Sequence, residues 1–249
     1  MRAISIAGYH HSGKTTLVVN IIKELKKRGY KVQSIKDIHY EEFTMETPHS
    51  NSWKHWEASG DTVIARGLHE TYKIWHRQLS LPEMLVEMEA DYLIVEGMTK
   101  AALPRIICAK DDQQLEELVN PTVMAVSGIY ADQHQKYQHL PVYKSTSEIS
   151  EIVDLIEAKS FAVLPQAEPE CCSACGFSCF EMVGKILAGE KSRQDCVADN
   201  QAKLELSVGG KEIKIVPFVQ KILADTVEAI VRNLDNSERG DIVLKIKQK

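Results

Sequence analysis

Hydrophobic residues in the first half of the chain form short runs, and the first two are separated by a segment with helical periodicity. The runs span residues 3–7, 30–35, 92–97, 105–109 and 122–128. Between the first two, one helical face is formed by Leu17, Val18, Ile21, Ile22 and Leu25, and Gly29 suits its end. Strands that alternate with helices predict an α/β fold with a doubly wound, mostly parallel sheet.

The second half has a different pattern. Residues 147–158 predict a helix capped by Ser147, and the proline-containing stretch 161–170 predicts a linker. Alternating residues in 203–208 and 211–216 flank two glycines and predict a hairpin. A helix is expected to begin at Pro217 and a last strand to span 241–247. We therefore expect three parts: a domain over 1–160, a cysteine-rich module over 170–198 and a small β-β-α-β module over 199–249.

The loop after the first strand has the sequence GYHHSGKT and fits G-x-x-x-x-G-K-S/T at every fixed position. Its glycines let the backbone curl so that N–H groups face a phosphate, and the helix that follows adds its positive end. Lys14 is expected to reach the terminal phosphates, and the Thr15 hydroxyl to bind Mg²⁺. The predicted nucleotide-binding residues are Gly8, Tyr9, His10, His11, Ser12, Gly13, Lys14, Thr15 and Thr16. Adjacent histidines in a tight loop point different ways, so a metal shared by His10 and His11 is not expected.

Acidic residues end two of the predicted strands. Glu96 follows the buried run YLIV, and Asp37 follows the second strand. Ligands of open α/β sheets bind at the carboxyl ends of the strands. Glu96 is therefore expected to hold a magnesium-bound water or to orient the attacking water, with Asp37 as a rival or partner. Glu96 and Lys14 are the candidate catalytic residues, and they would make the chain a slow Mg²⁺-dependent GTPase.

The base and the long connection are harder to assign. Ala109-Lys110-Asp111-Asp112 approximates the guanine-reading pattern N/T-K-x-D, in which Lys110 and Asp112 would contact the base; an ordinary charged turn is the alternative. Residues 39–76 hold five of the nine histidines and all three tryptophans. That segment could bind a partner, a pterin-like ring or a phosphate.

Five of the six cysteines lie between Cys171 and Cys196. The spacing C-x2-C-x3-C-x16-C is formed by Cys172, Cys175, Cys179 and Cys196. Three thiolates from one loop and a fourth from beyond a helix could hold a four-iron four-sulfur (4Fe–4S) cluster, with zinc as the main rival. The other cysteine, Cys108, lies in a predicted buried strand and is expected to be a core residue.

Composition excludes several classes of protein. The 249 residues are 44% hydrophobic and 26% charged, typical of a globular protein, with a net charge of -5. No general basic field would attract nucleic acid. No apolar run approaches the ~18 residues of a spanning helix, and no signal-peptide pattern is present, so we expect a cytoplasmic protein without a membrane role.

Several segments in order resemble one known family. GYHHSGKTTL, SIKDIHY, HSNSWKHWEASGD and LIVEGMTKAALPRIICAKD are together similar to molybdopterin-guanine dinucleotide biosynthesis protein B (MobB), over roughly residues 1–145. The resemblance implies a dimeric GTP-binding fold that assists a guanylyltransferase, or another molybdopterin-handling enzyme, in attaching GMP to molybdopterin. It implies GTP and Mg²⁺ at residues 8–16, with Glu96 beside the γ-phosphate. The cysteine segment resembles the small four-cysteine iron–sulfur domain of corrinoid and carbon monoxide metabolism proteins.

Three functions follow from these features. The first is a GTP-binding accessory protein of molybdenum or tungsten cofactor biosynthesis. The second is a metallocentre-assembly nucleoside triphosphatase or metallochaperone, whose cysteine module carries the metal. The third is a small-molecule kinase, which ranks last because residues 129–145 contain no arginine for a lid.

Overall fold

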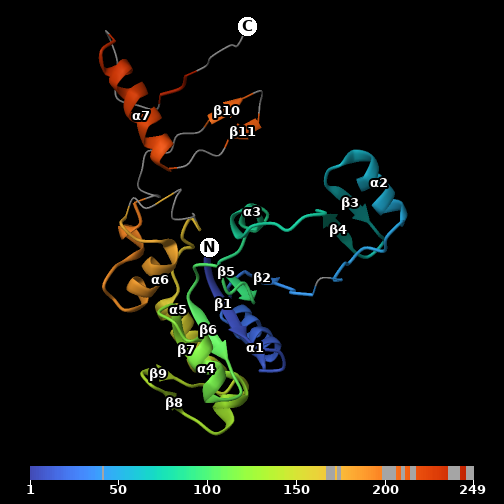
Figure 1. The fold of residues 1–249 in the computed structure, drawn as a ribbon, viewed down its shortest axis with the longest axis vertical. Coiled ribbons are helices and arrows are strands. Elements are labelled where there is room, and N and C mark those ends of the chain that lie inside the picture. The colour runs from blue at the N-terminus through green and yellow to red at the C-terminus, as the bar shows by residue number, and fades with distance from the viewer. Residues whose placement is uncertain are drawn as a thin grey trace. The chain divides into compact units, whose positions relative to one another are not determined.

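The computed structural model describes residues 1–40, 42–166, 172, 175–197, 206–208, 211–213, 217–234 and 242–244. The chain divides into two compact units, Met1–Gln166 and Ala167–Lys249. Figure 1 shows the elements of both units. No helix in these described ranges is both long and apolar enough to cross a bilayer.

The core of the first unit is a five-stranded sheet in the order β2-β5-β1-β6-β7 (Figure 1). The strands are β1 (Arg2–Gly8), β2 (Val32–Lys36), β5 (Tyr92–Glu96), β6 (Arg105–Cys108) and β7 (Val123–Ser127). Every neighbouring pair is parallel. Val142 continues the sheet through a parallel bridge to Val126. The α/β prediction with a mostly parallel sheet is therefore confirmed, and each predicted apolar run of the first half is a strand.

Helices cover the sheet through the apolar faces that the sequence shows. α1 (Lys14–Lys27) buries Leu17, Val18, Ile21 and Leu25 and packs on β1, β2, β5 and α5 (Ile149–Lys159). α3 (Leu81–Val86) and α4 (Asp112–Leu118) place Leu81 and Leu115 in two core clusters. Those clusters also include Ala3 and Ala7, which lie on one face of β1 because side chains alternate along a strand.

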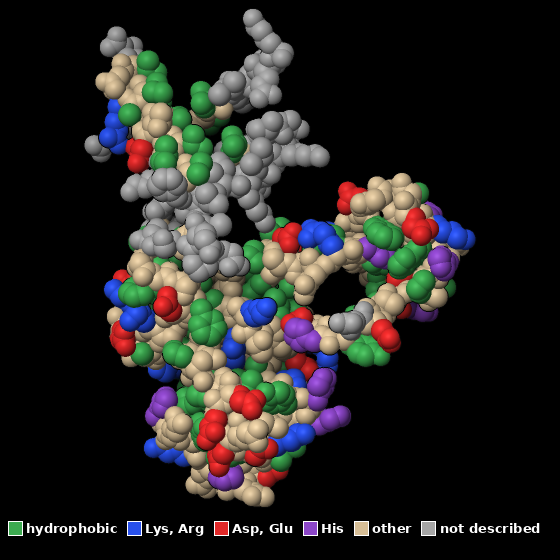
Figure 2. Space-filling view, viewed as in Figure 1, with side chains coloured by type: hydrophobic (Ala, Val, Ile, Leu, Met, Phe, Trp, Pro, Cys, Tyr) green, Lys and Arg blue, Asp and Glu red, His purple; other side chains and the backbone are tan. Residues whose placement is uncertain are grey.

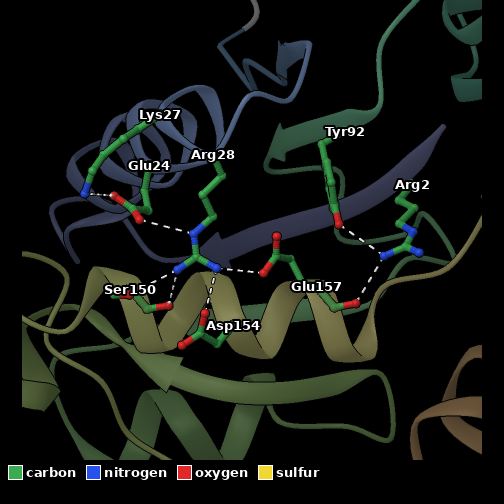
Figure 3. A network of polar contacts seen from close by, with 8 residues as sticks. All are labelled: Arg2, Glu24, Lys27, Arg28, Tyr92, Ser150, Asp154 and Glu157. Carbon is green, nitrogen blue, oxygen red and sulfur yellow. Dashed lines mark hydrogen bonds and ion pairs between the residues drawn. The ribbon is translucent and has the colours of Figure 1, made fainter.

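An arginine joins the carboxyl end of α1 to α5 (Figure 3). One terminal nitrogen of Arg28 lies 2.6 Å from carboxylate oxygens of Asp154 and Glu157, and its Nε lies 3.1 Å from Glu24. Burial by itself lowers the pKa of Arg28, but hydrogen bonds with Asp154, Glu24 and Glu157 raise that pKa above its ordinary value. The network holds α1, whose first residues are Lys14 and Thr15, against the unit.

The connection between β2 and α3 contains structure that the sequence pattern did not predict. α2 (Asn51–Ser59) is followed by an antiparallel hairpin of β3 (Val63–Arg66) and β4 (Thr71–Ile74). The His76 ring stacks on Trp56 at 4.0 Å between centroids and meets Trp53 edge-on at 4.9 Å. His76 Nε2 lies 2.8 Å from the buried Glu46 carboxylate. Aromatic packing thus accounts for part of the histidine and tryptophan content of residues 39–76.

Two predictions near the end of the first unit are wrong. Ser147 does not cap α5; the capping residue is Glu148, whose side chain accepts from the Lys144 backbone N–H at 2.7 Å. Residues 161–166 are not a free linker, because Leu164 is buried and the Gln166 side chain exchanges hydrogen bonds of 2.8 and 2.9 Å with the Ala102 backbone. Residues 167–170 lie outside the described chain.

The second unit contains α6 (Cys179–Leu187), a 3-10 turn at Arg193–Asp195, β10 (Leu206–Val208), β11 (Lys211–Ile213) and α7 (Pro217–Arg232). A capping box of Ser178 and Glu181 begins α6. The strands β10 and β11 pair antiparallel, and α7 begins at Pro217, as the sequence predicts. Ile242–Leu244 form no strand, so the expected strand over 241–247 is wrong there, and its other residues lie outside the described chain.

Candidate nucleotide-binding site

The loop between β1 and α1 needs glycine where the sequence has it. Gly8 has φ +147° and Gly13 has φ +96°, which L side chains rarely adopt. A Cβ built on Gly8 would lie 2.0 Å from the Cys108 carbonyl oxygen on β6. The loop therefore passes directly over the end of the neighbouring strand, at the carboxyl edge of the sheet.

Gly128, which the sequence pattern did not single out, packs against the backbone of this loop. Gly128 follows β7 and has φ +84°. A Cβ at this position would lie 2.2 Å from the Ser12 carbonyl oxygen and 3.1 Å from the Cys108 Cβ. The turn after β7 and the phosphate loop are thus in backbone contact. A glycine directly after a fully buried strand is the only signal of this contact in the sequence.

Side chains of the loop converge on one carbonyl. Lys14 Nζ donates to the Tyr9 carbonyl oxygen at 2.7 Å, and the buried Ser12 hydroxyl donates to the same oxygen at 2.9 Å. The Tyr9 hydroxyl donates to the Glu117 carboxylate on α4. This hydrogen bond is the main reason that the pKa of Tyr9 is raised. The loop is held from the α4 side as well as from β6 and β7.

Glu96 and Thr15 lie together, as expected for a site that holds Mg²⁺. The Thr15 hydroxyl donates to Glu96 Oε1 at 2.8 Å, and Lys36 Nζ lies 3.2 Å from the same oxygen. Glu96 is buried at the end of β5. A hydroxyl and a carboxylate are hard oxygen donors, the type that Mg²⁺ prefers. The donor set therefore fits the metal that the motif implies.

Asp37 is held by the neighbouring turn. Its Oδ2 accepts from the Met98 backbone N–H at 3.0 Å and lies 2.9 Å from His39 Nε2. A Cβ built on Gly97 would lie 2.9 Å from the Asp37 Cβ, so the turn after β5 needs glycine there. These contacts of Asp37 orient the turn that follows Glu96.

A buried arginine supports the same turn. Arg105 donates from Nη2 to the carbonyl oxygens of Thr99 and Ala101 at 2.9 and 3.1 Å. Burial lowers the pKa of Arg105 to about 10. No sequence pattern selected this residue, because its partners in this turn are backbone carbonyls.

The histidines and Thr16 of the loop are exposed. The rings of His10 and His11 lie 6.4 Å apart at 51°, and His11 has φ +57°. Among the described residues, no three His, Cys, Asp or Glu side chains form a group that could hold a metal ion. The two rings are tilted relative to each other.

The turn that contains the candidate base-reading residues is hydrogen-bonded to the protein, and the Asp112 side chain has a partner. Asp111 caps α4 by accepting from the Gln114 backbone N–H at 2.9 Å, and the Lys110 N–H donates to the Gln114 side chain at 3.1 Å. Asp112 Oδ1 accepts from the Tyr130 hydroxyl at 2.7 Å. Burial and then this hydrogen bond raise the pKa of Tyr130 to about 12. One carboxylate oxygen of Asp112 is therefore occupied by the protein itself.

The described cysteines of the second unit are not brought together as a set of metal ligands. Cys172 and Cys175 have free, partly exposed thiols, while Cys196 is buried and Cys179 is the first residue of α6. In the first unit, Cys108 is fully buried, and burial raises the pKa of its thiol to about 12. The prediction of Cys108 as a core residue is confirmed.

Charges of both signs are interspersed over the face of the first unit that Figure 2 shows. The expectation of no nucleic-acid role, which rests on the net charge of -5, stays a prediction.

Comparisons with known proteins identify the family of this chain. Residues 3–128 match the family described as MobB, molybdopterin guanine dinucleotide synthesis protein B. A Methanocaldococcus jannaschii protein named putative molybdopterin-guanine dinucleotide biosynthesis adapter protein is 27% identical over 240 residues, covering 94% of this chain and 92% of that protein. A probable adapter protein of the same kind from Bacillus subtilis is 22% identical over 151 residues, covering 59% of this chain and 87% of its own length.

The fold also has a counterpart among solved structures. The crystal structure of Bacillus subtilis MobB matches with a TM-score of 0.52 and 22% identity, over 64% of this chain and 97% of that one. This likeness supports the fold, and the family match extends over half of the chain. The chain therefore belongs to the MobB family.

Proposed function

We propose that this chain is a GTP-binding adapter protein in the synthesis of molybdopterin guanine dinucleotide. Its family membership gives it a role in molybdenum cofactor biosynthesis. Nucleotide binding is supported above all by the hydrogen bond between Thr15 and Glu96, next to a loop whose backbone requires glycine at Gly8 and Gly13. A motif match without this geometry would have been much weaker support.

Each residue of the site has a proposed role. The loop amides over residues 8–16 and the Lys14 ammonium bind the β- and γ-phosphates, which requires Lys14 to leave the Tyr9 carbonyl. Thr15 would hold Mg²⁺, which neutralises phosphate charge when bound. Glu96 orients water near the terminal phosphate and supports slow hydrolysis, and Asp37 positions the turn beside it. Lys110 and the open oxygen of Asp112 face the base and favour guanine by a modest margin.

The proposed partner is a guanylyltransferase or another molybdopterin-handling enzyme, and the proposed assembly is a homodimer. The names of the relatives, which call them adapter proteins, support a partner. If the role is correct, the chain will increase the rate of GMP transfer to molybdopterin by a co-purified guanylyltransferase. Light scattering of the isolated protein tests the dimer.

Calorimetry with Lys14→Ala tests the nucleotide site. A charge-assisted hydrogen bond contributes about 1.5–3 kcal/mol, so GTP affinity should fall roughly ten- to hundred-fold. Lys23→Ala, on the same helix but outside the loop, is the matched control and should bind GTP like the wild type. Unchanged GTP affinity in Lys14→Ala would contradict the phosphate-loop assignment.

We further propose a three-part organisation over 1–160, 170–198 and 199–249, in which Cys172, Cys175, Cys179 and Cys196 bind a 4Fe–4S cluster. Support for the cluster comes from the spacing of the four cysteines. The similarity to the Methanocaldococcus jannaschii protein over 240 residues extends beyond the first unit and supports only a second part of the chain. The described residues hold no assembled ligand group, so these thiols would have to converge when the cluster binds.

Anaerobically purified protein should then be brown and contain about four irons per chain. A colourless preparation with one zinc per chain would reject the cluster in favour of a zinc site. Rapid transfer of the cluster to an apo-enzyme, without any effect on GMP transfer, would favour the alternative function of a metallochaperone.

A further inference from the structure

The register of the sheet places a lysine beside the proposed magnesium site. β2 and β5 pair in parallel, with Lys36 opposite Glu96. Neighbouring residues in register extend from the same face of a sheet, and Lys36 Nζ lies 3.2 Å from Glu96 Oε1. The Lys36 side chain is 56% exposed and the Glu96 side chain 10% exposed. An exposed cation is therefore paired with a buried carboxylate.

The same carboxylate oxygen also accepts from the Thr15 hydroxyl at 2.8 Å. Thr15 is the residue that would bind Mg²⁺, so a divalent ion there would lie close to the Lys36 ammonium. Like charges at such short range repel, and the repulsion is strong beside a buried group. Lys36 and a metal ion at Thr15 would therefore compete for the Glu96 carboxylate.

Few described anions at this edge of the sheet could receive a displaced Lys36. Asp37 is already held by the Met98 N–H and by His39. The terminal phosphate of a nucleotide would lie beside Lys14 and Thr15, next to Glu96. The Lys36 side chain is exposed and has a flexible four-carbon stem, so its ammonium can reorient from the Glu96 carboxylate to this phosphate.

We propose that Lys36 holds Glu96 in the metal-free protein and binds the terminal phosphate of a nucleoside triphosphate when Mg²⁺ enters. This inference rests on the proposed function, since it needs a nucleotide at the loop. It makes Lys36 a second phosphate-binding lysine, supplied by β2 rather than by α1. A diphosphate lacks that terminal group, so Lys36 distinguishes triphosphate from diphosphate.

Lys36→Met removes the charge and keeps the length of the side chain. Lys31→Met is a matched control, because Lys31 precedes the same strand, pairs with Glu89 at 3.2 Å and is 58% exposed. Calorimetry in Mg²⁺ should show GTP affinity falling about tenfold in Lys36→Met, with GDP affinity within about twofold of wild type. Lys31→Met should change neither affinity, and Lys36→Arg should retain most of the preference for GTP.

The metal dependence of GDP binding gives a second readout, without turnover. In the GDP complex Lys36 stays on Glu96 and opposes Mg²⁺. The Mg²⁺ concentration that half-saturates fluorescent GDP binding should therefore fall a few-fold in Lys36→Met and stay unchanged in Lys31→Met. Equal losses of GTP and GDP affinity, or a rise in the Mg²⁺ requirement, would overturn the proposal.

Failure of the inference and failure of the proposed function are distinguishable. If the wild type binds neither GTP nor GDP, both are rejected. If the wild type binds both and Lys36→Met behaves like Lys31→Met, only the role of Lys36 is rejected. If thermal denaturation shows that Lys36→Met is not folded, Lys36→Gln and Lys36→Arg are compared instead. The preference for GTP should then be lost only in Lys36→Gln.

Discussion

Replacing Gly128 with alanine tests whether the close backbone contact between the turn after β7 and the phosphate loop is needed for stability and for GTP binding. At φ +84°, an alanine incurs the left-handed penalty of about 1–2 kcal/mol. The new Cβ would also lie 2.2 Å from the Ser12 carbonyl oxygen. Backbone must then move, and forced overpacking costs about 1–3 kcal/mol more. The expected total is about 2–5 kcal/mol, a large part of a typical stability.

Gly29→Ala separates the two contributions. Gly29 follows α1 with φ +92°, yet nothing lies within 4 Å of a Cβ built there. This variant therefore has the left-handed penalty without the steric contact. We expect Gly29→Ala to lose about 1–2 kcal/mol of unfolding free energy and to bind GTP like the wild type.

Urea unfolding followed by circular dichroism measures the stability, and calorimetry measures GTP binding. Gly128→Ala should be less stable than Gly29→Ala by about 1–3 kcal/mol. It should also lose GTP affinity, because the displaced Ser12 carbonyl belongs to the loop. Equal stabilities of the two variants, together with wild-type GTP binding in Gly128→Ala, would refute the argument.

Three further predictions concern single side chains. Glu96→Gln keeps the shape and removes the charge, so single-turnover assays should show a larger loss in Mg²⁺-dependent hydrolysis than in GTP affinity; unaffected turnover would make Glu96 structural. Arg28→Met removes the ion pairs with Glu24, Asp154 and Glu157; at about 0.2–1 kcal/mol for each pair, the unfolding free energy in urea should fall by about 0.6–3 kcal/mol. Lys27→Met, at a 78% exposed side chain, removes one pair and should cost much less. Asp112→Asn should reduce the preference for GTP over ATP in competition binding, and an unchanged preference would remove Asp112 from the base site.

Local patterns were sufficient for much of the fold. Buried strands are visible as short apolar runs because both faces of a parallel sheet are covered. The phosphate loop is visible because its backbone needs glycine at Gly8 and Gly13, and only a glycine satisfies those angles without strain. Glu96 could be predicted because it ends a buried strand, and the carboxyl edge of such a sheet is where ligands bind.

Features that depend on contacts between separate elements could not be predicted from local patterns. α2 and the β3–β4 hairpin have no fully buried side chain within them, so their periodicity is weak, and the aromatic contacts of His76 come from separate elements. The last predicted strand fails at Ile242–Leu244 because alternation alone does not supply a partner strand.

Local requirements can be read along the chain: which runs are buried, where a left-handed turn is needed and which donors can bind phosphate or Mg²⁺. Contacts between separate elements cannot: Lys36 lies beside Glu96, Gly128 contacts the Ser12 carbonyl, and Tyr130 occupies one oxygen of Asp112 only because the chain folds in three dimensions. Strand order and register bring together residues that are far apart along the chain, such as Ser12 and Gly128, and no periodicity along the chain encodes which strand ends become neighbours.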